Sequence, residues 1–160
     1  MKTKNKFISL VIWYLPVLIV QILSAWVTYT QMSPWYEAVK KAPWNPPSWV
    51  FAPVWSVLYI MMTVAVWLVY NTTAYNKLKR ASYILFFIQL LLNGLWSFLF
   101  FGLHDPLLAF IDLSLLIVFE IATIVTFYQV NKAAGLLLLP YLAWTLYAET
   151  LNGAVLYLNN

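Results

Sequence analysis

Long hydrophobic runs separated by short polar segments set the pattern of this chain. Each run is about 20 residues long or slightly longer, which is the length that an α-helix needs to cross the hydrocarbon core of a bilayer. The runs extend over residues 7–29, 49–70, 81–102, 107–128 and 136–158. The pattern therefore predicts an all-α integral membrane protein, a bundle of five transmembrane helices that forms a single domain over residues 1–160.

The first run follows a basic start, which is also typical of a signal peptide. The apolar part of a signal peptide is only about 7–15 residues long and ends at a cleavage site of small residues. Residues 7–29 exceed that length and lack such a site. We therefore expect them to form the first transmembrane helix.

The segment of residues 33–48 interrupts the pattern. It reads SPWYEAVKKAPWNPPS and contains four prolines, which lack a backbone N–H donor and exclude a regular helix. Its aromatic rings, together with Trp49, suit the membrane interface, where amphipathic rings lie at headgroup depth. We expect an ordered loop at the membrane surface, and Pro47 is placed to start the second helix.

Composition supports the membrane assignment. Hydrophobic residues make up 64% of the chain and charged residues only 9%, whereas about a quarter of the residues in soluble domains are charged. The absence of cysteine excludes disulfides and thiolate metal sites. The net charge of +4 lies in short clusters at the ends of the apolar runs, which indicates membrane topology and argues against a nucleic-acid partner.

The basic residues also predict an orientation. With five spans, the N-terminus, residues 71–80 and Lys132 share one side, which carries seven Lys and Arg residues. The other side carries only Lys40 and Lys41. Because basic residues accumulate in cytoplasmic loops, we expect a bacterial cell-membrane protein with its N-terminus in the cytoplasm and the proline-rich loop outside.

Several polar side chains fall inside the expected spans. They are Gln21, Gln89, Asn93, Asp112, Glu120, Glu149 and Asn152. A charged group at the bilayer centre costs about 2.5–3.5 kcal/mol on insertion scales, so these groups should face the bundle interior, pair or be protonated. Two interpretations stay open: a proton or ion path, and interhelical hydrogen bonds that fix the packing.

Aromatic and amide side chains recur at helical spacing on three of the expected helices. The stripes consist of Trp55 and Tyr59; of Gln89, Asn93, Trp96 and Phe100; and of Tyr141, Trp144, Ala148 and Asn152. Such a lining suits a pocket for a flat aromatic ligand, and it suits a plain packed core equally well. Spacing alone leaves both interpretations open.

Most catalytic and metal sites are excluded by the residue types present. The chain has no glycine-rich phosphate loop and no G-x-S-x-G sequence. Its one histidine, His104, falls in a short turn, and a metal site needs several clustered ligands. We therefore expect no metal site and no resident cofactor.

Three segments carry a resemblance to a known family. Residues 35–59 read WYEAVKKAPWNPPSWVFAPVWSVLY, residues 89–102 read QLLLNGLWSFLFFG, and residues 139–152 read LPYLAWTLYAETLN. Together with Asp112 in the fourth span, these segments are similar to the signature of the TspO family, the translocator protein and peripheral benzodiazepine receptor-like proteins. The match covers essentially the whole chain and indicates a bacterial member.

The resemblance implies a bundle of five transmembrane helices, commonly a homodimer, whose first loop closes over a pocket. The family binds porphyrins, benzodiazepine-type drugs and, in animals, cholesterol. Carried over position by position, the ligand-binding residues are Tyr36, Trp44, Pro47, Trp55, Asn93, Trp96, Trp144 and Ala148, and the stripe on the second helix adds Tyr59.

The function implied by the resemblance is that of a receptor-like membrane protein. It would bind protoporphyrin and other flat hydrophobic ligands for sensing, regulation or transport. Because some bacterial members degrade protoporphyrin in light, the alternative is a light- and oxygen-dependent enzyme in which Trp55 and Trp144 react. A sterol transporter is less favoured because no basic residue follows Tyr157, and an ion channel because few polar residues share a stripe.

The sequence departs from the family pattern at two places. The family's Lys-Pro pair is Lys41-Ala42-Pro43 here, so the first proline is displaced by one residue within the lid loop. Glu149 stands where the family usually has a small polar residue. Whether Glu149 faces the pocket or a dimer interface stays open.

Overall fold

The computed structural model describes residues 5–73 and 76–159, apart from the side chain of Asn76. Lys2 and Lys4, which contribute to the predicted orientation, lie outside these residues. Five helices in the described part of the chain are long and apolar enough to cross a membrane, and no strand occurs there. The prediction of an all-α bundle of five transmembrane helices is therefore confirmed.

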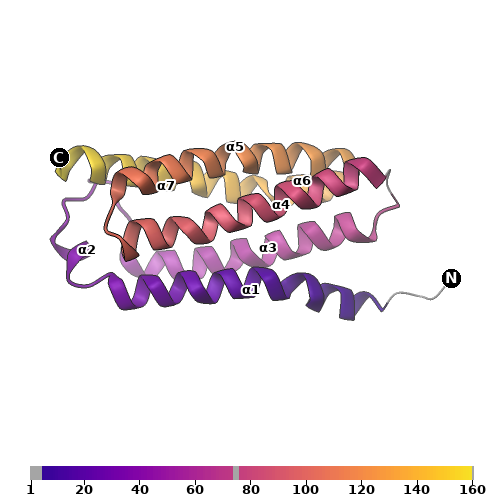
Figure 1. Cartoon of the computed structure of the whole chain (residues 1–160), viewed down its shortest axis with the longest axis horizontal. Helices are drawn as coiled ribbons and strands as arrows, with labels where there is room; N and C mark the ends of the chain where they lie inside the picture. Colours follow the sequence, from indigo (N-terminus) through magenta and orange to yellow (C-terminus); the bar gives the residue numbers. More distant parts are fainter. Residues whose placement is uncertain (1–4, 74–75, 160) are drawn as a thin grey trace.

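The long helices lie side by side, and the segments that connect them lie at the two ends of the bundle (Figure 1). The helical segments are α1 (Lys6–Gln31), α2 (Trp35–Ala38), η1 (Ser48–Val50), α3 (Phe51–Asn71), α4 (Asn76–Ser97), η2 (Phe98–Gly102), α5 (Pro106–Val130), α6 (Lys132–Leu137) and α7 (Leu139–Asn159). Helix α1 begins at the end of the bundle opposite to the end at which α7 finishes.

The fifth span is less regular than its hydrophobic run. The helix expected over residues 136–158 is interrupted at Leu138, between α6 and α7. Pro140 lacks the N–H that would continue the helical ladder through this point. The N–H of Leu138 bonds to the carbonyl oxygen of Gly135 at 3.2 Å, which closes the tighter turn that separates the two helices.

Local signals set the neighbouring boundaries. The carboxylate of Asp105 accepts hydrogen bonds from the N–H groups of Leu107 and Leu108 at 3.1 and 2.9 Å, and Pro106 occupies the first helical position of α5. The third span begins at Asn76, earlier than expected, and ends in the π-helical turn η2. Residues 103–105 connect this turn to the start of α5.

The core lies between α3, α4, α5, α6 and α7, and α1 is peripheral. Fully buried side chains from these elements form one cluster, which includes Met62, Val66, Phe86, Phe127 and Tyr141. Only 11% of the most hydrophobic stretch of α1 is buried, whereas the other four spans have 33–39%. Among the long helices, α1 packs mainly on α3 and α4.

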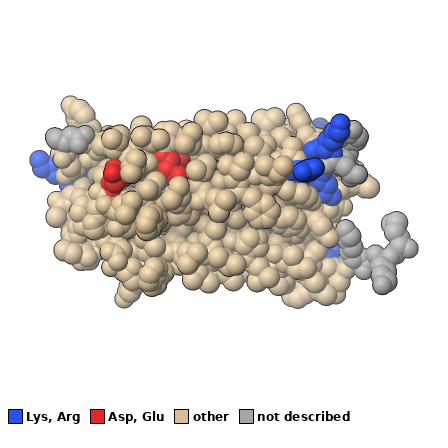
Figure 2. Space-filling model, in the orientation of Figure 1, with Lys and Arg blue, Asp and Glu red and all other residues tan. Residues whose placement is uncertain are grey.

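The outer surface is apolar over its middle. Exposed leucine, isoleucine, valine and aromatic side chains occur on all five spans. On the face shown in Figure 2, Lys and Arg lie at the two ends, and the wide band between them is uncharged except for two small acidic patches. Lipid is the solvent that such a band requires, so the chain is a multi-pass membrane protein.

Candidate ligand site in the helix bundle

A buried polar network joins three helices. The hydroxyl of Tyr59 on α3 donates to Oδ1 of Asn93 on α4 at 2.5 Å. Nδ2 of Asn93 lies 3.0 Å from the hydroxyl of Tyr141 on α7, which donates to Oε1 of Gln89 at 3.0 Å. The structure thus brings one or two polar members of each sequence stripe together, and their hydrogen bonds fix the register of α3, α4 and α7.

Aromatic rings lie next to this network. The ring of Trp55 is 5.7 Å from that of Tyr59 and 6.2 Å from that of Tyr141. Trp144 packs edge-on to Phe51 at 5.9 Å. Both tryptophans are partly buried and pack against the same core cluster.

The indole N–H of Trp144 stands out chemically. Its nitrogen is buried and has no hydrogen-bond partner among the described residues. A buried indole N–H usually finds an acceptor, because leaving it unpaired costs about 1–3 kcal/mol. The unpaired donor of Trp144 is therefore available to an acceptor atom that is not part of the described protein.

Trp96 and Ala148 lie where α4, α5 and α7 meet. Nε1 of Trp96 donates to Oδ1 of Asn152 at 3.0 Å, and Nδ2 of Asn152 donates to the carbonyl oxygen of Pro106 at 2.8 Å. The indole stacks on Phe100 with ring centres 5.1 Å apart. Trp96 also packs against a small buried cluster that contains Ala148. These contacts tie α4 and α7 to the start of α5.

The segment of residues 33–48, called the cover below and predicted from the resemblance to be a lid, packs on one end of the bundle. Tyr36, on the single turn α2, is buried against Phe101 at 5.6 Å, and its hydroxyl lies 3.4 Å from Oδ1 of Asn45. Burial raises the pKa of the Tyr36 hydroxyl, and the hydrogen bond with Asn45 partly opposes that shift. Nζ of Lys41 lies 4.6 Å from the centre of the Tyr36 ring, a cation–π contact.

Trp44 connects the cover to α7. Its indole N–H donates to Oγ1 of Thr150 at 3.3 Å, and its carbonyl oxygen accepts from the hydroxyl of Tyr147 at 2.7 Å. The Trp44 side chain itself is 56% exposed. Pro47 is exposed and directly precedes η1. Its restricted backbone helps to set the direction in which the chain enters the second span.

Lys40 and Asn159 fasten the cover at its other edge. The Lys40 N–H donates to Oδ1 of Asn159 at 3.0 Å, and Nδ2 of Asn159 donates to the Lys40 carbonyl oxygen at 2.9 Å. Sequence reasoning missed these two residues, and it missed Phe51, Tyr147 and Thr150. Phe51 and Tyr147 belong to the aromatic spacing of their helices and could have been found from it, whereas nothing in the sequence marks Asn159.

Two carboxylates of the fourth and fifth spans, those of Glu120 and Glu149, join α5 and α7. Oε2 of the fully buried Glu120 accepts from the hydroxyl of Thr145 at 2.8 Å. Oε1 of Glu149 accepts from the hydroxyl of Ser114 at 2.6 Å, so Glu149 points toward α5. Both contacts agree with the packing interpretation. No cluster of three His, Cys, Asp or Glu residues that could hold a metal occurs within the described part of the chain.

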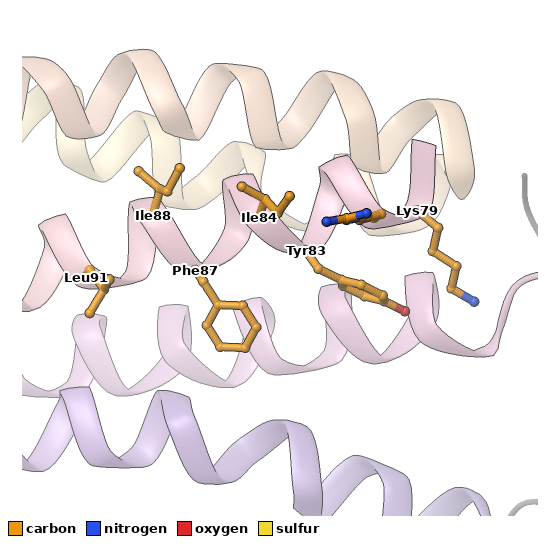
Figure 3. Close-up of a pocket in the computed structure, with 7 residues that line it drawn as sticks. Lys79, Tyr83, Ile84, Phe87, Ile88 and Leu91 are labelled. Carbon is orange, nitrogen blue, oxygen red and sulfur yellow. The ribbon is translucent and has the colours of Figure 1, made fainter. Parts of the chain in front are cut away.

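Two surface grooves lie outside the predicted site. One follows the outer face of α4 (Figure 3), and the other lies at the end of the bundle between α2, the start of α5 and the end of α7. Each has a volume of about 510 Å³. None of the predicted ligand-binding residues lines either groove.

Comparison with known proteins identifies the family. Residues 12–158 match the TspO/MBR family. The chain is 43% identical over 125 residues to the tryptophan-rich protein TspO of Chlorobaculum tepidum, an overlap that covers 78% of this chain and 79% of the relative. It is 39% identical over 152 residues to the protein of the same name from Archaeoglobus fulgidus, covering 95% and 97% of the two chains.

More distant relatives include proteins from animals and from other bacteria. The human translocator protein is 38% identical over 122 residues, which is 76% of this chain and 72% of the relative. The tryptophan-rich sensory protein of Cereibacter sphaeroides is 35% identical over 127 residues, which is 78% and 77% of the two chains. The resemblance seen in the sequence is confirmed, and the chain belongs to the TspO/MBR family.

Proposed function

We propose that this protein is a membrane receptor-like protein that binds protoporphyrin and other flat hydrophobic ligands between α3, α4 and α7. The observation that carries the proposal is the indole N–H of Trp144, which is buried without a partner among the described residues. A pocket of this kind is mostly apolar and has a few placed polar groups that orient the ligand. Trp144 would supply such a group beside rings that can stack on a macrocycle.

The aromatic rings around this N–H support a flat ligand. Trp55 and Trp144 pack against one core cluster, and Phe51 lies 5.9 Å from Trp144. Stacked and edge-on aromatic contacts contribute about 0.5–1.5 kcal/mol per pair beyond the area that they bury. The buried Tyr59, one helical turn from Trp55 on α3, and its partner Asn93 on α4 add hydroxyl and amide groups.

The cover formed by residues 33–48 supports a ligand that enters from one end of the bundle. Its hydrogen bonds to α7, through Trp44 and Lys40, are between exposed groups that water can replace. Opening the cover would break these exposed bonds and also the packing of Tyr36 against Phe101. In this proposal Tyr36, Trp44 and Pro47 hold the cover, and Trp96 and Ala148 form the rear wall of the site.

The names of the relatives favour sensing or transport over catalysis. Relatives of this chain are called sensory protein and translocator protein. The alternative is that bound protoporphyrin, excited by light, reacts with oxygen and with Trp55 or Trp144 and is degraded. The partly buried rings of these tryptophans would serve both functions, so only the reaction in light separates them.

The setting of the site is part of the same proposal. The protein acts as a homodimer in a bacterial cell membrane, and its N-terminus lies in the cytoplasm. The described basic residues Lys6, Lys77, Arg80 and Lys132 lie near the ends of helices that meet at one end of the bundle, which supports this orientation.

The test is a protoporphyrin titration of the purified protein, followed by quenching of tryptophan fluorescence in the dark. We expect saturable quenching that is lost in a Trp55→Ala/Trp144→Ala variant. The matched control is Trp26→Ala/Trp49→Ala, which removes the same number of rings from exposed positions and should still bind. Equal, linear quenching in all three proteins would mean that porphyrin only partitions into detergent, and the proposal would fail.

Illumination of the same samples separates the two functions. Loss of the porphyrin absorption band in light, in the wild type but not in a Trp144→Phe variant that still binds, would favour the enzyme. A band that is stable in light, with saturable binding, would favour sensing or transport.

A further inference from the structure

The cover carries positive charge, whereas carboxyl groups lie inside the bundle. Residues 33–48 contain Lys40 and Lys41 against one carboxylate, Glu37. No Lys or Arg stands in the middle of any described span, where Glu120 and Glu149 join α5 and α7. An anionic group on a ligand would therefore meet cations at the cover and further carboxyl groups deeper in the bundle.

Lys41 is held above a buried ring of the cover. Its Nζ lies 4.6 Å from the centre of the Tyr36 ring and donates to the carbonyl oxygen of Val39 at 3.1 Å. Neither partner is an anion, and no ion pair of Lys41 occurs within the part of the chain that the structure describes. Because an ammonium group has three N–H donors, at least one of them remains available to an acceptor on a ligand.

The ring beneath Lys41 leads to one wall of the proposed site. Tyr36 packs edge-on to Phe100 with ring centres 6.2 Å apart, and Phe100 stacks on Trp96 at 5.1 Å. Trp96 in turn packs against the cluster that contains Ala148. Lys41 thus lies at the cover end of a continuous row of rings that runs into the bundle.

The residues that follow Lys41 lead to the other wall. Ala42 is only 6% exposed, so the chain directly after Lys41 is packed against protein. The carbonyl oxygen of Trp44 accepts a hydrogen bond from Tyr147, whose ring centre is 5.5 Å from that of Trp144. Lys41 therefore stands between the two segments of the cover that contact the walls of the site.

A porphyrin has the polarity that this arrangement requires. Protoporphyrin is a flat apolar ring whose propionate groups lie on one edge. Burial of an ionised carboxylate without a counter-charge is costly, and the middle of the spans offers it no Lys or Arg. The ring would therefore lie between α3, α4 and α7 with its propionate edge at the cover.

We propose that Lys41 binds a carboxylate on the edge of the ligand, and that the site selects flat hydrophobic ligands with an acidic group on one edge. The inference rests on the proposed function and defines its ligand class. The contact is a charge-assisted hydrogen bond from Nζ, which is stronger than a bond between neutral groups. Lys40 has no such role, because its side chain is exposed and its contacts with Asn159 are made by its backbone.

The test compares protoporphyrin with its dimethyl ester, which has the same ring and no charge on that edge. Both are titrated into the purified protein in the dark, and quenching of tryptophan fluorescence gives the two affinities. The ratio of diacid affinity to ester affinity should be about fivefold larger in the wild type than in Lys41→Met, the upper end of what an ion pair near the surface contributes. In this double-mutant cycle, the different partitioning of the two ligands into detergent cancels.

The controls separate one contact from general attraction. Lys41→Arg keeps the charge and should retain the wild-type ratio, and ester binding should be unchanged in Lys41→Met. Lys40→Met is the matched control, because it removes the same charge from the same segment and leaves both backbone bonds with Asn159 in place. An unchanged ratio in Lys41→Met, or equal losses in Lys41→Met and Lys40→Met, would overturn this inference alone. Absence of saturable binding of either ligand to the wild type would instead contradict the proposed function itself.

Discussion

Trp96 and Trp144 occupy two regions of one bundle and differ in what their indole N–H groups do. Trp96 lies where α4, α5 and α7 meet, and its N–H is the first link of a chain through Asn152 to the backbone of α5. Trp144 lies where α7 meets α3, and its buried N–H has no described partner. Two residues with the same predicted role therefore differ: Trp96 ties three helices together, whereas Trp144 has an unpaired N–H, the group on which the proposed ligand site depends.

The largest expected difference between the two regions is in stability. Trp96→Ala should lower the free energy of unfolding by about 3–5 kcal/mol, because it leaves a cavity beside Phe100 and removes the bond to Asn152. Trp144→Ala should cost about 1–3 kcal/mol less, because Trp144 is half-buried like Trp96 but its loss leaves no acceptor without a donor. Unfolding by sodium dodecyl sulfate in mixed micelles, followed by circular dichroism, measures both. Equal losses would contradict the division.

Phenylalanine substitutions isolate the two N–H groups. Trp96→Phe leaves Oδ1 of Asn152 without its donor and should cost about 1–3 kcal/mol of stability. Trp144→Phe strands no acceptor and should cost less, but it should weaken protoporphyrin binding about threefold to tenfold, the value of one hydrogen bond of about 0.5–1.5 kcal/mol. The same unfolding assay and a fluorescence titration measure the pair. If Trp96→Phe weakens binding without affecting stability, the roles of the two residues are reversed.

The sequence predicts the helices and their inward faces but not this division. Hydrophobic runs fix the number of spans because a bilayer admits few other structures. Spacing places Asn93 and Trp96 on one face of α4, and the network with Tyr59 and Tyr141 agrees with that. Spacing says nothing about which residue of another helix lies opposite. Trp96 is satisfied only because α5 starts at Pro106, where its first carbonyl oxygen can fix Asn152.

The interruption of the fifth span could have been predicted from the sequence, whereas the hydrogen bonds between Lys40 and Asn159 could not. Pro140 stands inside the run expected as one helix, and its missing N–H accounts for the break at Leu138. The contact between Lys40 and Asn159 joins residues that are 119 positions apart. It depends on the path of an irregular loop over the end of α7, which local patterns do not encode.

The smallest expected effect concerns the hydrogen bonds between Lys40 and Asn159. It tests whether opening of the cover controls release of a ligand bound near Trp144. Asn159→Ala removes both hydrogen bonds to the Lys40 backbone, but the groups are exposed, so the stability loss should stay below about 1 kcal/mol. Hydrogen exchange within residues 33–48 should quicken, and protoporphyrin should dissociate about twofold to fivefold faster, because less than about 1 kcal/mol is lost from the closed state. Asn71→Ala is the matched control, since it removes an exposed amide at the opposite end of the bundle.

Faster exchange in the loop without faster release would mean that the cover opens independently of the ligand. Trp144 would then be reached by another path, through the lipid-facing side of the bundle. Faster release in Asn159→Ala, combined with unchanged release in Asn71→Ala, would join the cover and the unpaired N–H into one site. Trp96 would then stabilise the bundle, and Trp144 would belong to a ligand site that opens to one end of it.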